Sequence, residues 1–321
     1  MVRGYDEPDC QKEYRMILCF DIGGTTIKIA HAFAQDDIRP VARVPTPARD
    51  YPTFVAALRD AIAAAPGRPE RLAFSIAGVV DSETGIATVA NIPCISGRPL
   101  QRELEAALNL PVDLANDADC FALAEATVGA GRGHDVVFGV ILGTGVGGGV
   151  VVRGALINAA GGFAGEWGHG AVAQRILGTP EVTLPAFACG CGQVGCLDAI
   201  CSARGMEKLH YCLHGIEAAS TEIVAGWEAG LPEPGRTIDI WLGLLSGPLA
   251  MVENLLGAGI VAVGGGLANS RPLIAALDRA VRAQILRKFD RPLIVPAGCA
   301  IEPGLVGAAI LGLGRRVSPA I

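Results

Sequence analysis

The sequence is short of aromatic residues and of positive charge. Phe, Trp and Tyr make up 5% of its 321 residues, and 32 Asp and Glu outnumber 26 Lys and Arg, which gives a formal net charge of −6. A nucleic-acid-binding surface needs clustered Lys and Arg, and the chain shows no such cluster. We therefore expect no nucleic-acid partner.

The chain also lacks a long uninterrupted hydrophobic run. Residues 1–15 mix acidic and basic side chains without an apolar core, so we expect a flexible lead-in and not a signal peptide. Residues 136–152 are apolar, but six glycines interrupt them and the run is slightly short for a membrane span. A glycine-rich turn between two buried strands fits better, which predicts a cytoplasmic protein without a membrane partner.

Disulfides are not expected either. Ten cysteines in a chain of this length do not make a secreted disulfide scaffold, and seven of them lie outside any cluster. Isolated cysteines of this kind are typical of reduced thiols that pack as small hydrophobic side chains.

The other three cysteines lie close together and follow a histidine. Cys189, Cys191, Cys196 and His169 offer three thiols and one imidazole, the ligand set of a closed tetrahedral zinc site. Glycines between the cysteines let the backbone turn tightly enough to direct three thiolates at one point. The alternatives are cysteines that pack in the core or form a disulfide, but the spacing favours a structural Zn²⁺.

Two carboxylates flank these metal-ligand candidates, Glu166 and Asp198. Carboxylates are hard oxygen donors, poorly suited to a thiolate-rich site. They are free to accept hydrogen bonds from a polyhydroxylated substrate. We interpret this stretch as a metal-fixed knuckle of backbone that holds a sugar.

What the sequence has in abundance is glycine, with 43 residues, in a chain long enough for two domains. The first glycine-rich turn lies between two predicted strands, residues 16–20 and 29–33. Gly23 and Gly24 let the backbone point N–H groups at an anion. Side chains suited to a phosphate and a hydrated Mg²⁺ surround them: Asp21, Thr25, Thr26 and Lys28. The alternative is an ordinary hairpin turn with a capping aspartate.

A second strand, turn and strand occupy residues 136–153. Its turn offers Gly143, Thr144, Gly145 and Gly147, and it begins 143 − 23 = 120 residues after the first turn. Two such hairpins predict an internal duplication with one phosphate-binding loop in each half.

A third glycine run follows the predicted strand 259–263. Gly264, Gly265 and Gly266 would form a floor without side chains on which a base and ribose could rest. The alternative is a plain glycine-rich loop between a strand and a helix.

Polar residues also follow the short predicted strand 111–115. Ligands of α/β sheets usually bind at the carboxyl ends of strands, which makes Asp117 the candidate general base and its neighbour Asn116 a candidate ligand. The alternative is that one of them only caps the helix that follows. Apolar spacing predicts further helices over residues 51–65, 100–108, 202–258 with a kink or break near 243–248, 271–289 and 304–313.

Taken together, these motifs resemble the ROK family of sugar kinases and repressors over nearly the whole chain. The resemblance rests on the order of Asp21-x-Gly-Gly-Thr, Asn116-Asp117, Gly143-Thr-Gly, Glu166-x-x-His169, the three cysteines and Gly264-Gly-Gly. It implies an α/β, actin-like ATPase (ribonuclease H-like) fold with two α/β domains around a central cleft. Residues 16–127 plus 303–321 would form the small domain, and 128–302 the large domain with its zinc knuckle.

The same resemblance implies roles for the residues. The first two turns would hold the phosphates of ATP with Mg²⁺, and residues 264–266 would face the adenosine. The sugar would be bound by Gly78, Asn91, Asn116, Asp117, Glu166, His169 and Asp198. His169 would serve both the zinc and the sugar, because a metal on one ring nitrogen makes the other a donor. Where the family has Glu, Asp198 is one methylene shorter.

Within the family, residues 90–100, 116–126 and 189–196 look most like kinases of N-acetylglucosamine. The resemblance thus implies an ATP-dependent transfer to the C6 hydroxyl of N-acetyl-D-glucosamine, with glucose, N-acetylmannosamine or fructose as alternative sugars, and a homodimer. A sugar-responsive repressor is the competing class. It needs a DNA-binding helix-turn-helix before the first strand, and about fifteen mostly polar, acidic residues are too few for one.

Overall fold

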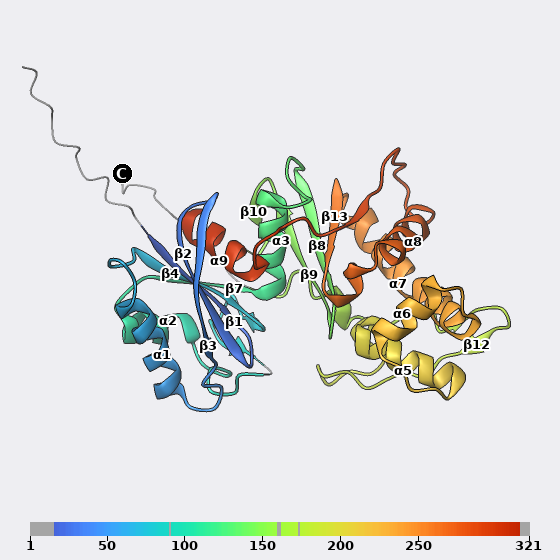
Figure 1. The fold of residues 1–321 in the computed structure, drawn as a ribbon, viewed down its shortest axis with the longest axis horizontal. Coiled ribbons are helices and arrows are strands. Elements are labelled where there is room, and N and C mark those ends of the chain that lie inside the picture. Colours follow the sequence, from blue (N-terminus) through green and yellow to red (C-terminus); the bar gives the residue numbers. More distant parts are fainter. Residues whose placement is uncertain (1–15, 90, 159–161, 173, 315–321) are drawn as a thin grey trace, which may run out of the picture.

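The computed structural model describes residues 16–89, 91–158, 162–172 and 174–314. The predicted lead-in, residues 1–15, and residues 315–321 lie outside this range. Two five-stranded mixed sheets form the framework, with two helices packed between them (Figure 1).

The first sheet has the strand order β3-β2-β1-β4-β7. Its strands are β1 (Ile17–Ile22), β2 (Thr26–Ala34), β3 (Asp37–Pro45), β4 (Arg71–Ile76) and β7 (Val112–Asn116). The strands β1, β4 and β7 run parallel, and β2 and β3 are antiparallel additions at one edge. Residues of β1 alternate between two cores, as expected for a strand buried on both faces. One of these cores contains residues of α1 (Tyr51–Ala63) and α2 (Leu100–Leu108).

The second sheet repeats this plan in the order β10-β9-β8-β13-β14. Its strands are β8 (Val136–Leu142), β9 (Val146–Val152), β10 (Ala155–Leu156), β13 (Ile260–Gly264) and β14 (Ile294–Pro296). Here too an antiparallel hairpin is followed by parallel strands. The two predicted strand–turn–strand segments are confirmed as β1–β2 and β8–β9, so residues 136–152 form a hairpin. No helix in the described ranges has the length and hydrophobicity needed to span a bilayer.

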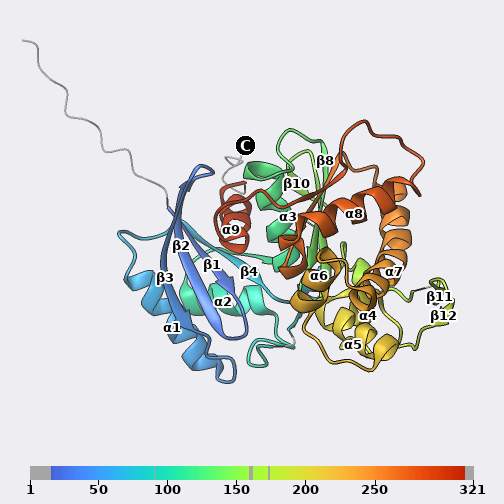
Figure 2. The same cartoon turned by 45° about the vertical axis from the view of Figure 1, so that its right-hand side comes forward.

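Helices α3 (Asp117–Val128) and α9 (Pro303–Gly314) join the two sheets. Each follows the last strand of one sheet and packs on the other: α3 on β8 and β9, and α9 on β1 and β4. The two helices also pack on each other, and they lie side by side in both views (Figure 2). A single apolar cluster therefore contains residues of both sheets.

The remaining helices share one apolar core with the second sheet. They are α4 (Leu197–Cys201), α5 (Ala203–His214), α6 (Ser220–Glu228), α7 (Pro232–Leu256) and α8 (Arg271–Arg282). Short elements complete the chain: β5 (Val79–Val80), β6 (Ala87–Thr88), β11 (Ile176–Leu177), β12 (Val182–Thr183) and the 3₁₀ turns Trp167–His169 and Gly266–Asn269.

Two helix predictions differ from the structure. The break expected near residues 243–248 does not occur, and α7 continues with Pro248 inside it. Trp241, Leu245 and Leu249 are fully buried on both sides of the proline, so packing holds the helix together there. Helix α8 ends at Arg282 and not near residue 289, and the Arg282 guanidinium bonds the Phe289 carbonyl of the segment that turns back.

The contact between α3 and α9 generates a stability prediction. A Cβ at Gly307 of α9 would lie 2.0 Å from the Cys120 carbonyl oxygen of α3. We expect Gly307→Ala to lower the free energy of unfolding by about 3 kcal/mol, because the two backbones must separate. Gly314→Ala at the end of the same helix meets no atom within 4 Å and is the control, with stability unchanged or slightly raised. Equal denaturation midpoints for the two variants would contradict this account.

Candidate functional site

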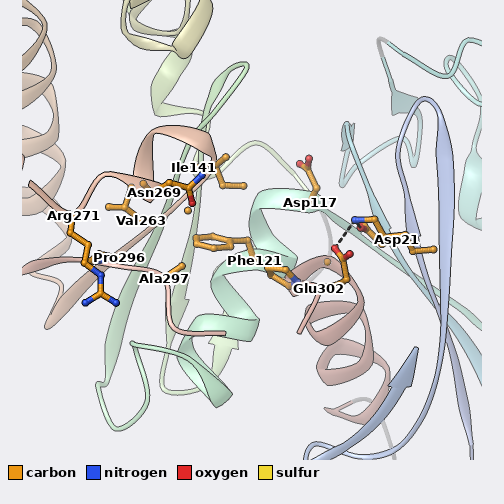
Figure 3. Close-up of a pocket in the computed structure, with 16 residues that line it drawn as sticks. Asp21, Asp117, Phe121, Ile141, Val263, Asn269, Arg271, Pro296, Ala297 and Glu302 are labelled. Carbon is orange, nitrogen blue, oxygen red and sulfur yellow. Dashed lines mark hydrogen bonds and ion pairs between the residues drawn. The ribbon is translucent and has the colours of Figure 1, made fainter. Parts of the chain in front are cut away.

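A cavity of about 510 Å³ opens where the two sheets and the two joining helices meet (Figure 3). Its polar lining contains Asp21 from the end of β1, Lys28 from β2, Asp117 from the start of α3, and Glu302 just before α9. The second sheet and the segments that follow its strands contribute Val263, Gly264, Gly265, Asn269, Arg271, Pro296 and Ala297. Both halves of the chain thus build one crevice.

An ion-pair chain crosses one side of this crevice. The Lys28 Nζ lies 3.1 Å from Asp21 Oδ2 and 2.7 Å from Glu302 Oε2. Glu302 also pairs with Arg43, and the Ser75 hydroxyl donates to Asp21 Oδ1 at 2.9 Å. These partners fix the Asp21 carboxylate in the crevice, where an oxygen donor suits a hydrated divalent cation.

Asp117 lies in the crevice as the first residue of α3 (Figure 3). Burial raises the pKa of its carboxyl to about 6, and the charges of Asp21 and Glu166 act in the same direction. A hydrogen bond from the Ala118 N–H opposes the shift. A carboxyl with a pKa just below neutrality can accept a proton at pH 7 and release it again, which is what a general base requires.

Asn116 is the N-cap of α3, as the capping alternative expected. Its Oδ1 accepts from the Ala118 N–H at 2.7 Å, and its Nδ2 donates to the Gly78 carbonyl at 2.9 Å. A Cβ at Gly78 would lie 2.5 Å from the Thr88 carbonyl oxygen, so a glycine is needed there for packing. Capping falls to Asn116, which leaves Asp117 to face the crevice.

A second cavity of about 420 Å³ adjoins the first, and Asn269 lines both. Its lining includes Gly143, Thr144 and Gly266 together with residues of α6. The predicted glycine turns meet here, since a Cβ at Gly265 would lie 2.4 Å from the Leu142 carbonyl oxygen. The turn after β8 and the turn after β13 therefore form one continuous floor with few side chains.

Six predicted nucleotide-binding residues lie outside the linings of both cavities: Gly23, Gly24, Thr25, Thr26, Gly145 and Gly147. The first four form the β1–β2 turn and the start of β2, where the Thr46 hydroxyl donates to the Gly23 carbonyl at 2.7 Å. A Cβ at Gly24 would lie 2.9 Å from that of Asn91, so the predicted sugar residue Asn91 borders this turn. The role of this group stays a prediction.

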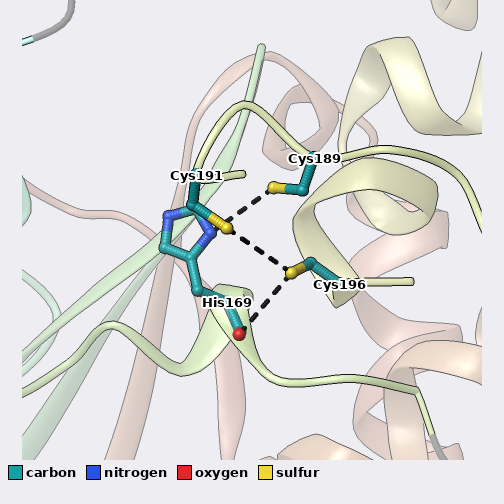
Figure 4. Close-up of side chains that lie close together, drawn as sticks. All are labelled: His169, Cys189, Cys191 and Cys196. Carbon is teal, nitrogen blue, oxygen red and sulfur yellow. Dashed lines mark hydrogen bonds between the residues drawn. The ribbon is translucent and has the colours of Figure 1, made fainter. Parts of the chain in front are cut away.

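The four proposed metal ligands converge on one point (Figure 4). The ligand atoms of His169, Cys189, Cys191 and Cys196 all lie within 4.8 Å of one another. Sγ atoms of Cys191 and Cys196 are 3.7 Å apart, and Cys189 Sγ is 3.6 Å from His169 Nδ1. A disulfide needs about 2 Å between sulfurs, whereas ligands about 2.3 Å from a tetrahedral ion lie about 3.8 Å apart. The geometry fits a zinc ion and excludes a disulfide.

The two ring nitrogens of His169 face different groups. Nδ1 faces the thiols, while Nε2 lies 3.6 Å from Glu166 Oε2. Burial raises the pKa of Glu166, His169 lowers it, and the nearby Asp198 raises it. One imidazole therefore connects the cysteine cluster to a carboxylate that acts electrostatically on Asp117.

Asp198, in the first turn of α4, has partners on two segments. Its Oδ1 accepts from the Val146 N–H at 2.7 Å, and its Oδ2 lies 3.7 Å from Cys189 Sγ. This carboxylate therefore joins the β8–β9 turn to the cysteine cluster, a link that the sequence did not predict.

Sequence reasoning missed several lining residues. Glu302 precedes a proline at the start of the last helix and gives no local signal, and Phe121, Arg271 and the α6 side chains are equally inconspicuous. Asn269 had a signal, because it lies three residues after the third glycine run.

Comparisons with known proteins agree with this geometry. The ROK family model matches residues 17–315. An N-acetyl-D-glucosamine kinase of Yersinia pseudotuberculosis is 34% identical over 304 residues, covering 92% of this chain and 99% of the relative. The N-acetylgalactosamine kinase AgaK of a Shewanella species is 33% identical over 297 residues, covering 92% and 96%.

A solved structure gives the same result. The ROK hexokinase of Thermus thermophilus superposes with a TM-score of 0.78 at 30% identity, over 92% of this chain and 97% of its own. The predicted fold class, the actin-like ATPase fold of these kinases, is thereby confirmed. The chain belongs to the ROK family, because the family model spans nearly all of the described residues and a relative is 34% identical in sequence.

Proposed function

We propose that this chain is an ATP-dependent sugar kinase that phosphorylates the C6 hydroxyl of N-acetyl-D-glucosamine. The observation that carries the proposal is the position of Asp117. Its carboxyl has a pKa raised to about 6, and it lies in a crevice that Lys28, Asp21 and the glycine floor also line. The kinship with N-acetylhexosamine kinases supports the class of sugar.

The chain's own residues account for the transfer. The sugar hydroxyl would lie against Asp117, whose carboxylate takes its proton as the oxygen attacks the terminal phosphorus of ATP. Lys28 would offer its remaining N–H donor to phosphate oxygens, because two carboxylates already occupy the others. Asp21 would hold a Mg²⁺ ion that accompanies the nucleotide, and this ion would supply charge neutralisation at the phosphates.

Nucleotide and sugar would occupy adjoining parts of the crevice. The second cavity, with Gly143, Thr144, Gly266 and Asn269, has the size and flat floor to take the adenosine. Glu166 would accept a hydrogen bond from a sugar hydroxyl, and His169 would donate one to another. Asn116 and Gly78 would lie next to the sugar. A structural Zn²⁺ on the His169 cluster would hold the loop that carries both groups.

We also propose that the two lobes of the chain close over both substrates. Residues 16–127 with 303–321 would move as one lobe and 128–302 as the other, which excludes water from the phosphates. The homodimer that the resemblance implies stays a prediction, for which sedimentation of the purified chain is the direct measurement.

The first test is a panel of sugars. ATP consumption should be highest with N-acetyl-D-glucosamine, and phosphate should appear on its C6 oxygen in the product's NMR spectrum. N-acetyl-D-galactosamine is the second candidate, because its kinase is nearly as similar to this chain. A preference for glucose, N-acetylmannosamine or fructose would change the proposed sugar but leave the assignment as a sugar kinase. If no sugar stimulates ATP consumption, the assignment as a sugar kinase is rejected.

Asp117→Asn tests the general base. The amide keeps the shape but cannot take a proton, so kcat should fall by roughly 10²–10⁴-fold while sugar binding, measured by calorimetry, stays within about threefold. In the unmodified enzyme, kcat/KM should fall as the pH drops through about 6, where the Asp117 carboxylate becomes protonated. A variant that keeps more than a tenth of kcat would remove Asp117 from this role.

Cys191→Ser tests the metal. Zinc content, measured by mass spectrometry, should fall from about one ion per chain to none, and the KM for the sugar should rise about tenfold while that for ATP holds. Cys212→Ser is the matched control, since Cys212 is an exposed thiol on α5 outside the cluster. Full sugar affinity in a metal-free Cys191→Ser enzyme would show that zinc does not position Glu166 and His169.

A further inference from the structure

The loop that leads from β10 to the turn Trp167–His169 carries two of the proposed sugar ligands. Its final residues are fixed to β9. Gly165 has φ = +91°, and a Cβ there would lie 2.1 Å from the Gly148 carbonyl oxygen. The Trp167 Nε1 donates to the Gly147 carbonyl at 3.0 Å. These contacts fix the final residues of the loop against the second sheet.

The start of this loop is held by Asn158. Its Nδ2 donates to the Ala164 carbonyl at 2.9 Å, and its Oδ1 accepts from the Ala164 N–H at 3.2 Å. The same Nδ2 donates to Asp119 Oδ2 at 3.3 Å. Asp119 lies on α3, two residues after Asp117. One amide thus connects the ends of the loop to the helix that carries the proposed base.

Burial of Asp119 at this position costs folding free energy. Asp119 is 3% exposed, and its Oδ1 has no hydrogen-bond partner within the described residues. Burial raises its pKa to about 7, the Asn158 hydrogen bond lowers it, and the charges of Glu166 and Asp117 raise it. A buried carboxyl with one oxygen unpaired destabilises the fold, and its hydrogen bond from Asn158 offsets part of that cost.

The backbone around Asp119 packs closely on β9. A Cβ at Gly149 of β9 would lie 2.6 Å from the Ala118 carbonyl oxygen and 2.9 Å from the Asp119 Cα. The first turn of α3 is therefore pressed onto β9. This packing fixes the backbone position from which the Asp119 side chain accepts the hydrogen bond of Asn158.

We infer that Asp119 is a positioning residue: through Asn158 it ties the loop of Glu166 and His169 to the first turn of α3, and so sets the distance between the sugar ligands and Asp117. This inference rests on the proposed function, because it assigns these groups to one substrate. It adds a residue that touches neither the sugar nor the nucleotide.

Asp119→Ala removes the acceptor for Asn158. The KM for the sugar should rise about tenfold, and kcat should fall as well because the sugar hydroxyl is displaced from Asp117. The KM for ATP should stay within about threefold, because the nucleotide floor belongs to other segments. Asp119→Asn is the rescue variant, since its amide oxygen still accepts from Asn158. Its sugar KM should stay within about twofold of the unmodified enzyme.

Asn158→Ala removes the same hydrogen bond from the other side and serves if Asp119→Ala does not fold. The double variant Asp119→Ala/Asn158→Ala should raise the sugar KM no more than Asn158→Ala alone, because both changes break one connection. Glu253→Ala is the matched control: Glu253 on α7 is also 3% exposed, has an unpaired oxygen and a pKa raised to about 7. It should lower stability without changing either KM.

Each outcome decides a separate point. A folded Asp119→Ala or Asn158→Ala enzyme with an unchanged sugar KM overturns the inference and leaves the proposed function standing. Independent, multiplied effects in the double variant overturn it as well. An unmodified chain that consumes no ATP with any sugar overturns the proposed function, and the inference with it.

Discussion

The packing of α3 on α9 is the contact on which the rest of the structure depends. Each helix follows one sheet and covers the other, so neither sheet has a complete core alone. The crossing also places the starts of both helices at the crevice. Asp117 opens α3, and a Cβ at Gly304 near the start of α9 would lie 2.4 Å from Asp21 Oδ1. Changes that separate the helices would therefore move both carboxylates at once.

The crevice concentrates negative charge where a triphosphate is proposed to bind. The pKa of Asp117 rises because the carboxyl is buried and because Asp21 and Glu166 lie close to it. Lys28 offsets part of this charge but is shared between Asp21 and Glu302. Such a site disfavours ATP alone, and a divalent cation that accompanies the nucleotide would remove the repulsion. On the proposed function, the same carboxylates that raise the pKa of Asp117 would make a divalent cation necessary for ATP to bind.

Local patterns made much of this predictable. The glycine turns after β1, β8 and β13 and the cysteine spacing are short-range signals, and the structure places the strands and the metal-ligand candidates as expected. What the sequence did not predict depends on long-range packing. Glu302 reaches Lys28 across 274 positions of chain, and Pro248 stays helical because its neighbours are buried. The two cavities share Asn269, which ends the 3₁₀ turn after β13.

Asp198 shows how the two substrate regions are coupled. It was predicted as a sugar ligand, yet its Oδ1 is engaged by the Val146 N–H of the β8–β9 turn and its Oδ2 lies beside Cys189. A Cβ at Gly145 would lie 2.8 Å from the same Oδ1, so this turn and α4 are in direct contact. The Asp198 side chain thus reaches both the backbone of this turn and the cysteine cluster, and its role as a sugar ligand stays a prediction. On the proposed function, a shift of the turn when a nucleotide binds would pass through this one carboxylate to the cysteine cluster, and from there to the segment that carries Glu166 and His169.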